Sequence, residues 1–148
     1  MDCKNIVEIK SGIYQKGALS FKDIYDSIKK HPLIKQSGSI LTFTGIVRNT
    51  SKNGKAIKKL KIEAYDELGN RTIRKICENI KNKYELIDLK IIHLKGTFEI
   101  SDDLVYVIVA SPHRQEGFKA LMEAVERYKK ELPVWMKEDF SNGSSKWV

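Results

Sequence analysis

His113 and Arg114 stand side by side where an apolar stretch, residues 104–110, gives way to an amphipathic pattern. We predict a strand followed by a helix, so both side chains would lie at the helix N-terminus, where unpaired backbone N–H groups and the helix dipole favour an anion. The planar guanidinium of Arg114 suits a phosphate or a carboxylate. In the alternative interpretation, Arg114 pairs with Glu116 or Glu138, and His113 only fills the end of the strand.

One lysine of the predicted helix has an unusual position. Lys129 lies four residues after Val125 and so falls on the apolar stripe of the helix, whose spacing is typical of a face packed on a core. The members of this stripe are Phe118, Leu121, Met122, Val125 and Leu132. Lys129 either covers apolar surface with its stem while its ammonium reaches water, or it is partly desolvated in a pocket beside Arg114 and Arg48. In the second case its amine could act as a nucleophile or proton-transfer group.

A third basic residue, Arg48, ends a predicted buried strand, immediately before a basic loop. It would lie at the same mouth as His113 if the two strands are neighbours. Residues 48–61 contain six basic residues and no acid. Such a cluster is also typical of a solvated loop and strand edge, kept soluble by lysines.

Composition limits the class of protein. The chain has 148 residues, of which 41% are hydrophobic and 31% charged, and we expect one globular domain, residues 1–148. Residues 104–110 form the longest apolar run, far below the roughly 20 residues that span a bilayer, so the cytoplasm is the expected location and no membrane partner is expected. A formal net charge of +8 favours an anionic partner without identifying it.

The best-specified enzyme motifs are absent from the sequence. It contains no glycine-rich phosphate loop, no HExxH, no GxSxG and no paired-cysteine metal site. Cys3 and Cys77 are far apart and are interpreted as free thiols, with Cys77 on a helical stripe. We therefore expect no cofactor and no metal.

The order of the elements predicts an α+β fold with a mostly antiparallel sheet. Strand patterns occur at 6–10, 39–47, 56–65, 86–94, 96–100 and 103–111. Helical patterns begin after Ser20, which can cap its helix, at about Asn70, and after His113. We expect the strands at 39–47 and 56–65 to form a hairpin, and Gly96 to be a turn between strands.

Several motifs in order resemble the large, catalytic subunits of molybdopterin synthase. The resemblance covers most of the chain and lies in "LTFTGIVRN" and the following "LKIEAY", in "IIHLKG", in "VIVASPHRQEGFKA", and in "YKKELPVWMKE" with the closing "WV". It implies an α/β hammerhead fold and a homodimer within a heterotetramer. It also implies a small ubiquitin-like partner subunit, whose C-terminal Gly-Gly thiocarboxylate enters a pocket of the large subunit.

The resemblance also implies a reaction: sulfur passes from the partner to cyclic pyranopterin monophosphate, in two rounds, and forms the dithiolene of molybdopterin. By position, Phe43 and Arg48 would line the pocket, His113 and Arg114 would bind the anionic substrate, and Lys129 would be the catalytic lysine.

Two positions depart from the family pattern. Met136 stands where a second active-site lysine is usual, and Leu94 where an arginine often follows the histidine. Lys137 could supply the second catalytic amine only if the backbone there is bulged, because neighbours on a strand face opposite sides. As an alternative function, the basic charge would suit a noncatalytic nucleic-acid-binding module, although no nucleic-acid motif is present.

Overall fold

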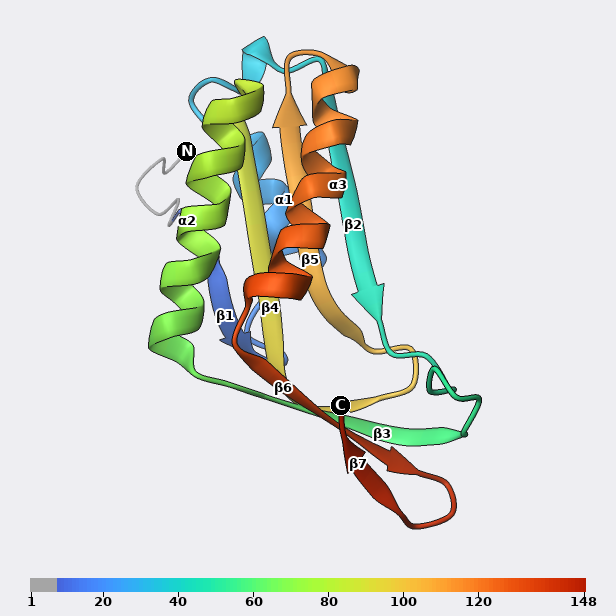
Figure 1. The fold of residues 1–148 in the computed structure, drawn as a ribbon. Helices are drawn as coiled ribbons and strands as arrows, with labels where there is room; N and C mark the ends of the chain where they lie inside the picture. Colours follow the sequence, from blue (N-terminus) through green and yellow to red (C-terminus); the bar gives the residue numbers. More distant parts are fainter. Residues whose placement is uncertain (1–7) are drawn as a thin grey trace.

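The computed structural model describes residues 8–148 and has the predicted α+β fold, with a seven-stranded, mostly antiparallel sheet (Figure 1). In chain order its elements are β1 (Gly12–Gln15), α1 (Phe21–Lys29), the 3₁₀ turn η2 (Ile34–Gln36), β2 (Ser39–Ile46), β3 (Ile57–Ala64), α2 (Asp66–Tyr84), β4 (Asp88–Glu99), β5 (Asp103–Ser111), α3 (Arg114–Glu131), β6 (Val134–Phe140) and β7 (Ser145–Trp147). The strand order is β2-β5-β4-β3-β6-β7, and β1 pairs in parallel with β4.

Helices cover both faces of the sheet (Figure 1). The α2 and α3 helices pack side by side on one face, where Ile73, Ile76 and Ala124 are fully buried against strands β4 and β5. Helix α1 covers the other face with Ile24 and Ile28. These two apolar layers fix the long strands β2, β4 and β5, whose ends carry the residues singled out above.

Helix α1 begins as the sequence predicts. The Ser20 hydroxyl accepts a hydrogen bond from the Asp23 backbone N–H at 3.2 Å, and the Asp23 carboxylate accepts one from the Ser20 N–H at 2.9 Å. This reciprocal arrangement is a capping box, which satisfies two N–H groups that the helix leaves unpaired.

The predicted buried face of α3 is correct only in part: Leu132 is buried, and Leu121 and Val125 pack against the core as partly buried side chains. Phe118 and Met122 are 62% and 64% exposed, and the buried residues are small ones and a tyrosine: Gly117, Ala120, Ala124 and Tyr128. A Cβ on Gly117 would lie only 2.5 Å from Leu41 Cδ1, so the helix approaches the sheet too closely there for a larger side chain. The prediction considered only large apolar residues and left out the small ones, which pack on the sheet. Lys129 therefore does not interrupt the core.

The predicted hairpin of 39–47 with 56–65 is also wrong. Strand β2 pairs with β5 at the edge of the sheet and is half exposed, and β3 pairs with β4 and β6. Near them the structure has an isolated antiparallel bridge between Thr50, which lies in the loop after β2, and Ala56. Sequence proximity favours a hairpin, but β5 and β4 offer β2 and β3 longer pairing partners.

The predicted turn at Gly96 is absent, because β4 continues through it. Gly96 has a positive φ of 128° and still pairs with Ile62 of β3. This strand pairs with β5 over its first half and with β3 over its second half, so it joins the two parts of the sheet. The kink lets β3, β6 and β7 cross below the ends of the other strands (Figure 1).

Other expectations concern the ends of elements. Helix α2 begins at Asp66, four residues before the expected start. The strand expected at 6–10 falls partly outside the described residues, and the remainder, 8–10, is not a strand.

Of the two cysteines, Cys3 lies outside the described residues. Cys77 is buried in α2 as predicted, and burial raises the pKa of its thiol to about 11. No helix in residues 8–148 is long and apolar enough to cross a bilayer.

Candidate active site

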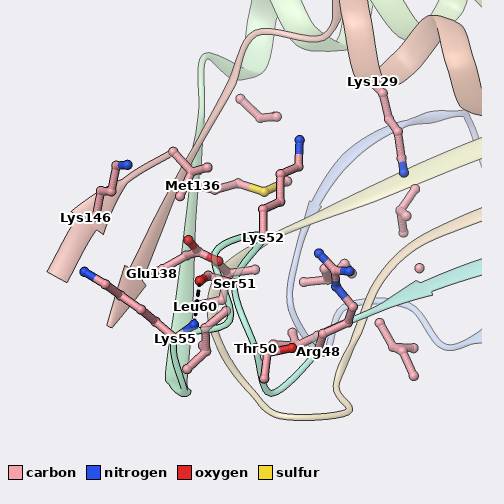
Figure 2. Close-up of a pocket in the computed structure, with 18 of the residues that line it drawn as sticks. Arg48, Thr50, Ser51, Lys52, Lys55, Leu60, Lys129, Met136, Glu138 and Lys146 are labelled. Atoms are coloured by element: carbon pink, nitrogen blue, oxygen red, sulfur yellow. Dashed lines mark hydrogen bonds between the residues drawn. The ribbon is translucent and has the colours of Figure 1, made fainter. Parts of the chain in front are cut away.

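A cavity of about 600 Å³ lies below the C-terminal end of α3. Its walls come from the end of β2, the following loop 47–56, the strands β3 and β6, and the last turn of α3 (Figure 2). These segments are far apart in the sequence and meet because the kinked half of β4 carries β3 and β6 under the helix. The cavity is thus a product of the sheet topology.

The mouth of the cavity is strongly cationic. Five basic side chains line it, against one carboxylate, that of Glu138: Arg48, Lys52, Lys55, Lys129 and Lys146. None of the five is ion-paired with a carboxylate in the described part of the chain. Unpaired cations around a concave surface focus a positive potential, which favours an anionic ligand.

Arg48 and Lys129 approach the cavity from opposite walls. Figure 2 shows Arg48 rising from the end of β2 and Lys129 descending from α3 toward the same space. Both side chains are exposed in the free chain, so Lys129 is available to solvent and to a ligand. The structure brings these two predicted site residues together.

Lys52 reaches the same space from the loop (Figure 2). This loop is closed by the Ser51 N–H, which donates to the Lys55 carbonyl at 2.9 Å, and by the Lys55 N–H, which donates to Ser51 Oγ at 3.1 Å. The side chain of Lys55 lies over the Phe140 ring, 5.3 Å from its centroid. The backbone bonds hold the loop as a defined turn at the cavity mouth.

The inner end of the cavity is apolar and contains one buried histidine. Phe43 of β2, predicted as a lining residue, is present there beside Leu104 and Val105. His93 of β4 is 1% exposed, and its ring meets the Tyr128 ring edge-on with centroids 5.7 Å apart. Burial lowers the pKa of His93 to about 4, so this imidazole is neutral at physiological pH.

Met136 lines the cavity, and Lys137 does not. On β6 the alternate residues Val134, Met136 and Glu138 face the cavity, because β6 pairs with β3 in unbroken register from Ala64 to Lys59. The bulge that would turn Lys137 inward is absent at this position. Its ammonium instead lies 5.9 Å from the centroid of the Trp147 ring.

His113 and Arg114 lie at the other end of the sheet. The condition set for a common mouth is met, since β2 and β5 are neighbours, but their pairing is antiparallel: Ser39 faces Ser111 and Ile46 faces Asp103. At about 3.3 Å per residue, the eight-residue β2 separates the two ends by roughly 25 Å. A common mouth within one chain is therefore excluded.

Arg114 has no ion pair with a described carboxylate, so its predicted alternative pairing with Glu116 or Glu138 is not formed. His113 is the N-cap residue of α3, and its carbonyl accepts a hydrogen bond from Ser111 Oγ at 2.7 Å. His113 and Arg114 thus form a basic group at a helix N-terminus, away from the cavity and without an ion pair to a described carboxylate.

Sequence reasoning missed Lys52, Lys146 and His93 as lining residues. Lys52 belongs to the basic cluster at 48–61, which the sequence marked as a whole without distinguishing its members. His93 sits within a strand pattern, and nothing in its spacing separates it from a core residue. Among residues 8–148 no group of three or more metal-ligating side chains occurs.

Known proteins with similar sequences and structures identify the family. A family model described as MoaE protein matches residues 14–131. The molybdopterin synthase catalytic subunit of Pyricularia oryzae is 38% identical over 112 residues, which cover 76% of this chain and 61% of that protein. This chain thus spans less than two thirds of the length of that relative.

Two solved structures share the fold. The crystal structure of molybdopterin synthase from Staphylococcus aureus matches with a TM-score of 0.80 and 30% identity, over 93% of this chain and 96% of that chain. A chain from the complex of subunits 1 and 2 of molybdopterin-converting factor from Helicobacter pylori has a TM-score of 0.71 and 23% identity, over 93% and 87% of the two chains. Because the family model matches most of its length, this chain belongs to the MoaE family.

Proposed function

We propose that this chain is the catalytic subunit of a molybdopterin synthase. It would transfer sulfur from the C-terminal thiocarboxylate of a small partner subunit to cyclic pyranopterin monophosphate. The observation that carries the proposal is membership of the family together with a cavity lined by five unpaired cations. The alternative of a nucleic-acid-binding module is disfavoured, because its only support was the basic charge, and part of that charge lines a concave cavity.

The cavity suits both reactants chemically. The substrate is a cyclic phosphate, which Arg48 and Lys52 can hold as cations while its ring enters the apolar inner end beside Phe43. A thiocarboxylate is also an anion, so the partner's tail is attracted to the same mouth. Each transfer moves one sulfur onto the substrate and leaves a carboxylate on the partner, and two transfers complete the dithiolene and open the cyclic phosphate.

Lys129 is our assignment for the amine at the reacting centre. It projects into the space opposite Arg48, and its ammonium has no carboxylate partner in the described part of the chain (Figure 2). An amine placed there can move a proton to or from the reacting atoms or act as a nucleophile. Lys137, stacked on Trp147, does not occupy a comparable position.

The partner and the assembly form part of the same proposal. The solved Helicobacter pylori protein, whose fold this chain shares, is a complex of two subunits, which supports a partner subunit here. We further propose a homodimer in the cytoplasm. In such a dimer His113 and Arg114 bind the substrate from a second copy, since within one chain they lie at the wrong end of β2.

Reconstitution tests the function directly. Purified chain, thiocarboxylated partner subunit and cyclic pyranopterin monophosphate should together produce molybdopterin, measured as its fluorescent oxidation product. The control is the same partner ending in an ordinary carboxylate, which should give none. Absence of product with the thiocarboxylated partner, while the complex forms, would overturn the proposed activity.

A further inference from the structure

The geometry points to His93 as a substrate-binding residue, which accepts a hydrogen bond from an N–H or O–H group on the ring of the substrate at the inner end of the cavity. This inference rests on the proposed function and adds a contact for the uncharged part of the substrate.

The tautomer of His93 follows from one hydrogen bond. Its Nδ1 lies 3.0 Å from the carbonyl oxygen of Leu94, and a carbonyl oxygen can only accept. The proton of the neutral ring is therefore on Nδ1, and Nε2 carries a lone pair. The imidazole is an acceptor on the side away from the backbone.

That acceptor has no hydrogen-bond partner in the described part of the chain. No described residue donates to Nε2, and Nε2 is not among the fully enclosed side-chain atoms that lack a partner, which are Ser37 Oγ, Ser39 Oγ and Glu116 Oε2. His93 is nevertheless one of the residues that line the cavity, although it is only 1% exposed. The edge-on contact with Tyr128 fixes the plane of the ring.

The surroundings make this acceptor selective. Leu104, Val105 and Phe43 line the same end of the cavity and provide no donor from their side chains. An unpaired buried acceptor is costly, so an occupant that brings a donor is favoured over one that does not. A neutral acceptor also rejects a phosphate, which leaves the anion to the cations at the mouth. The reduced pterin ring has N–H groups at its edge and fits this arrangement.

Two substitutions distinguish the role of His93 Nε2 as a hydrogen-bond acceptor from the packing role of the side chain. His93→Gln can place an amide oxygen where Nε2 lies, whereas His93→Asn keeps a donor near the Leu94 carbonyl but has no atom at the Nε2 position. We would measure the affinity of cyclic pyranopterin monophosphate by calorimetry for each protein bound to a partner that ends in a carboxylate, so that no turnover occurs. We expect His93→Asn to lose about tenfold in affinity and His93→Gln to stay within about threefold of the wild type.

The outcomes are distinct. Equal affinities in all three proteins, or an equal loss in both variants, would overturn the role of His93 alone. A wild-type complex that does not bind the substrate would overturn the proposed function and this inference with it.

Nitrogen NMR of the wild-type complex supplies a test that does not depend on the folding of a variant. Addition of substrate should move the resonance of the unprotonated Nε2 of His93 toward that of a hydrogen-bonded nitrogen. An unchanged resonance in the saturated complex would contradict the inference.

Discussion

Lys129 and Lys137 are eight positions apart and have different surroundings. Lys129 enters the cavity opposite Arg48, whereas Lys137 lies against the Trp147 ring on the other side of β6. The apolar pattern of the sequence placed Lys129 on a buried face, yet it is exposed at the cavity mouth. Burial therefore cannot be the argument for a chemical role of Lys129. The argument is its position, since Lys129 and Arg48 reach the same cavity from opposite walls (Figure 2).

The two lysines should respond differently to the same substitution. We expect Lys129→Met to fold and to bind the partner subunit but to lose nearly all molybdopterin formation, because methionine retains the apolar stem and lacks the amine. Lys137→Met is the matched control and should keep most of the activity. The reconstitution assay measures both, and a near-wild-type rate for Lys129→Met would remove this lysine from the mechanism.

His93 predicts a dependence of stability on pH. Its pKa is lowered from 6.5 to about 4 in the folded chain, so folding favours the neutral ring. The resulting stabilisation, on the order of 3 kcal/mol, is fully present above pH 6.5 and is lost as the pH falls through 4. We expect the free energy of unfolding, measured with urea, to fall more steeply between pH 6.5 and 4 in the wild type than in His93→Gln. Parallel pH profiles would contradict a buried neutral histidine.

At the scale of elements, the loop between β2 and β3 is the part of the basic cluster that matters for the cavity. Lys52 lines the cavity from this loop, whereas Lys59, on β3 and equally part of the cluster, is exposed and does not line it. The closed turn around Ser51 and Lys55 positions Lys52. The alternative of a purely solvating cluster therefore applies to some of its members and not to others.

Replacing Lys52 or Lys59 with methionine removes one positive charge from the chain in either case. Lys52→Met should weaken substrate binding by about 1 kcal/mol, roughly fivefold, since the contact is solvent-exposed. Lys59→Met should leave the affinity within about twofold, because its charge is remote from the anion and screened by salt. Calorimetric titration at low and moderate ionic strength compares them. Equal losses would assign the effect to net charge and not to the position of Lys52.

At the scale of the whole molecule, the antiparallel pairing of β2 and β5 decides which basic residues can act together. It keeps Arg48 and Lys129 at one end and places His113 and Arg114 at the other. A homodimer in which the second copy supplies Arg114 uses all four residues in one site. Symmetry would then create two such sites, one at each cavity.

Mixed dimers test this arrangement. Arg114→Ala alone should lower substrate affinity about tenfold to a hundredfold, through loss of a charge-assisted contact. Activity is then measured at a substrate concentration too low to occupy the Arg114→Ala site. Mixing Arg114→Ala with Lys129→Met, after dissociation and reassociation, should restore about a quarter of the wild-type activity under these conditions, since half of the dimers then hold one complete site. If Arg114 acted within its own chain, every mixed site would lack one residue and the mixture would remain as inactive as its components.

The sequence by itself determined the elements and their local details. Helical periodicity located the helices, the residues around Ser20 predicted its cap, and the order of elements predicted an α+β fold. The motifs around Arg48 and Lys129 indicated the family. These features depend on neighbours within a few positions along the chain, which a sequence records directly.

The tertiary structure alone decided which segments meet. It replaced the expected hairpin by the β2–β5 and β3–β6 pairings, carried β4 through Gly96, and brought small residues of α3 onto the sheet. As a result, His93 and Lys52 joined the cavity, and His113 was separated from it. Strand pairing and the side of a strand that faces a cavity depend on contacts between distant segments. Local spacing does not record these contacts, because several pairings satisfy the same alternation of apolar and polar residues.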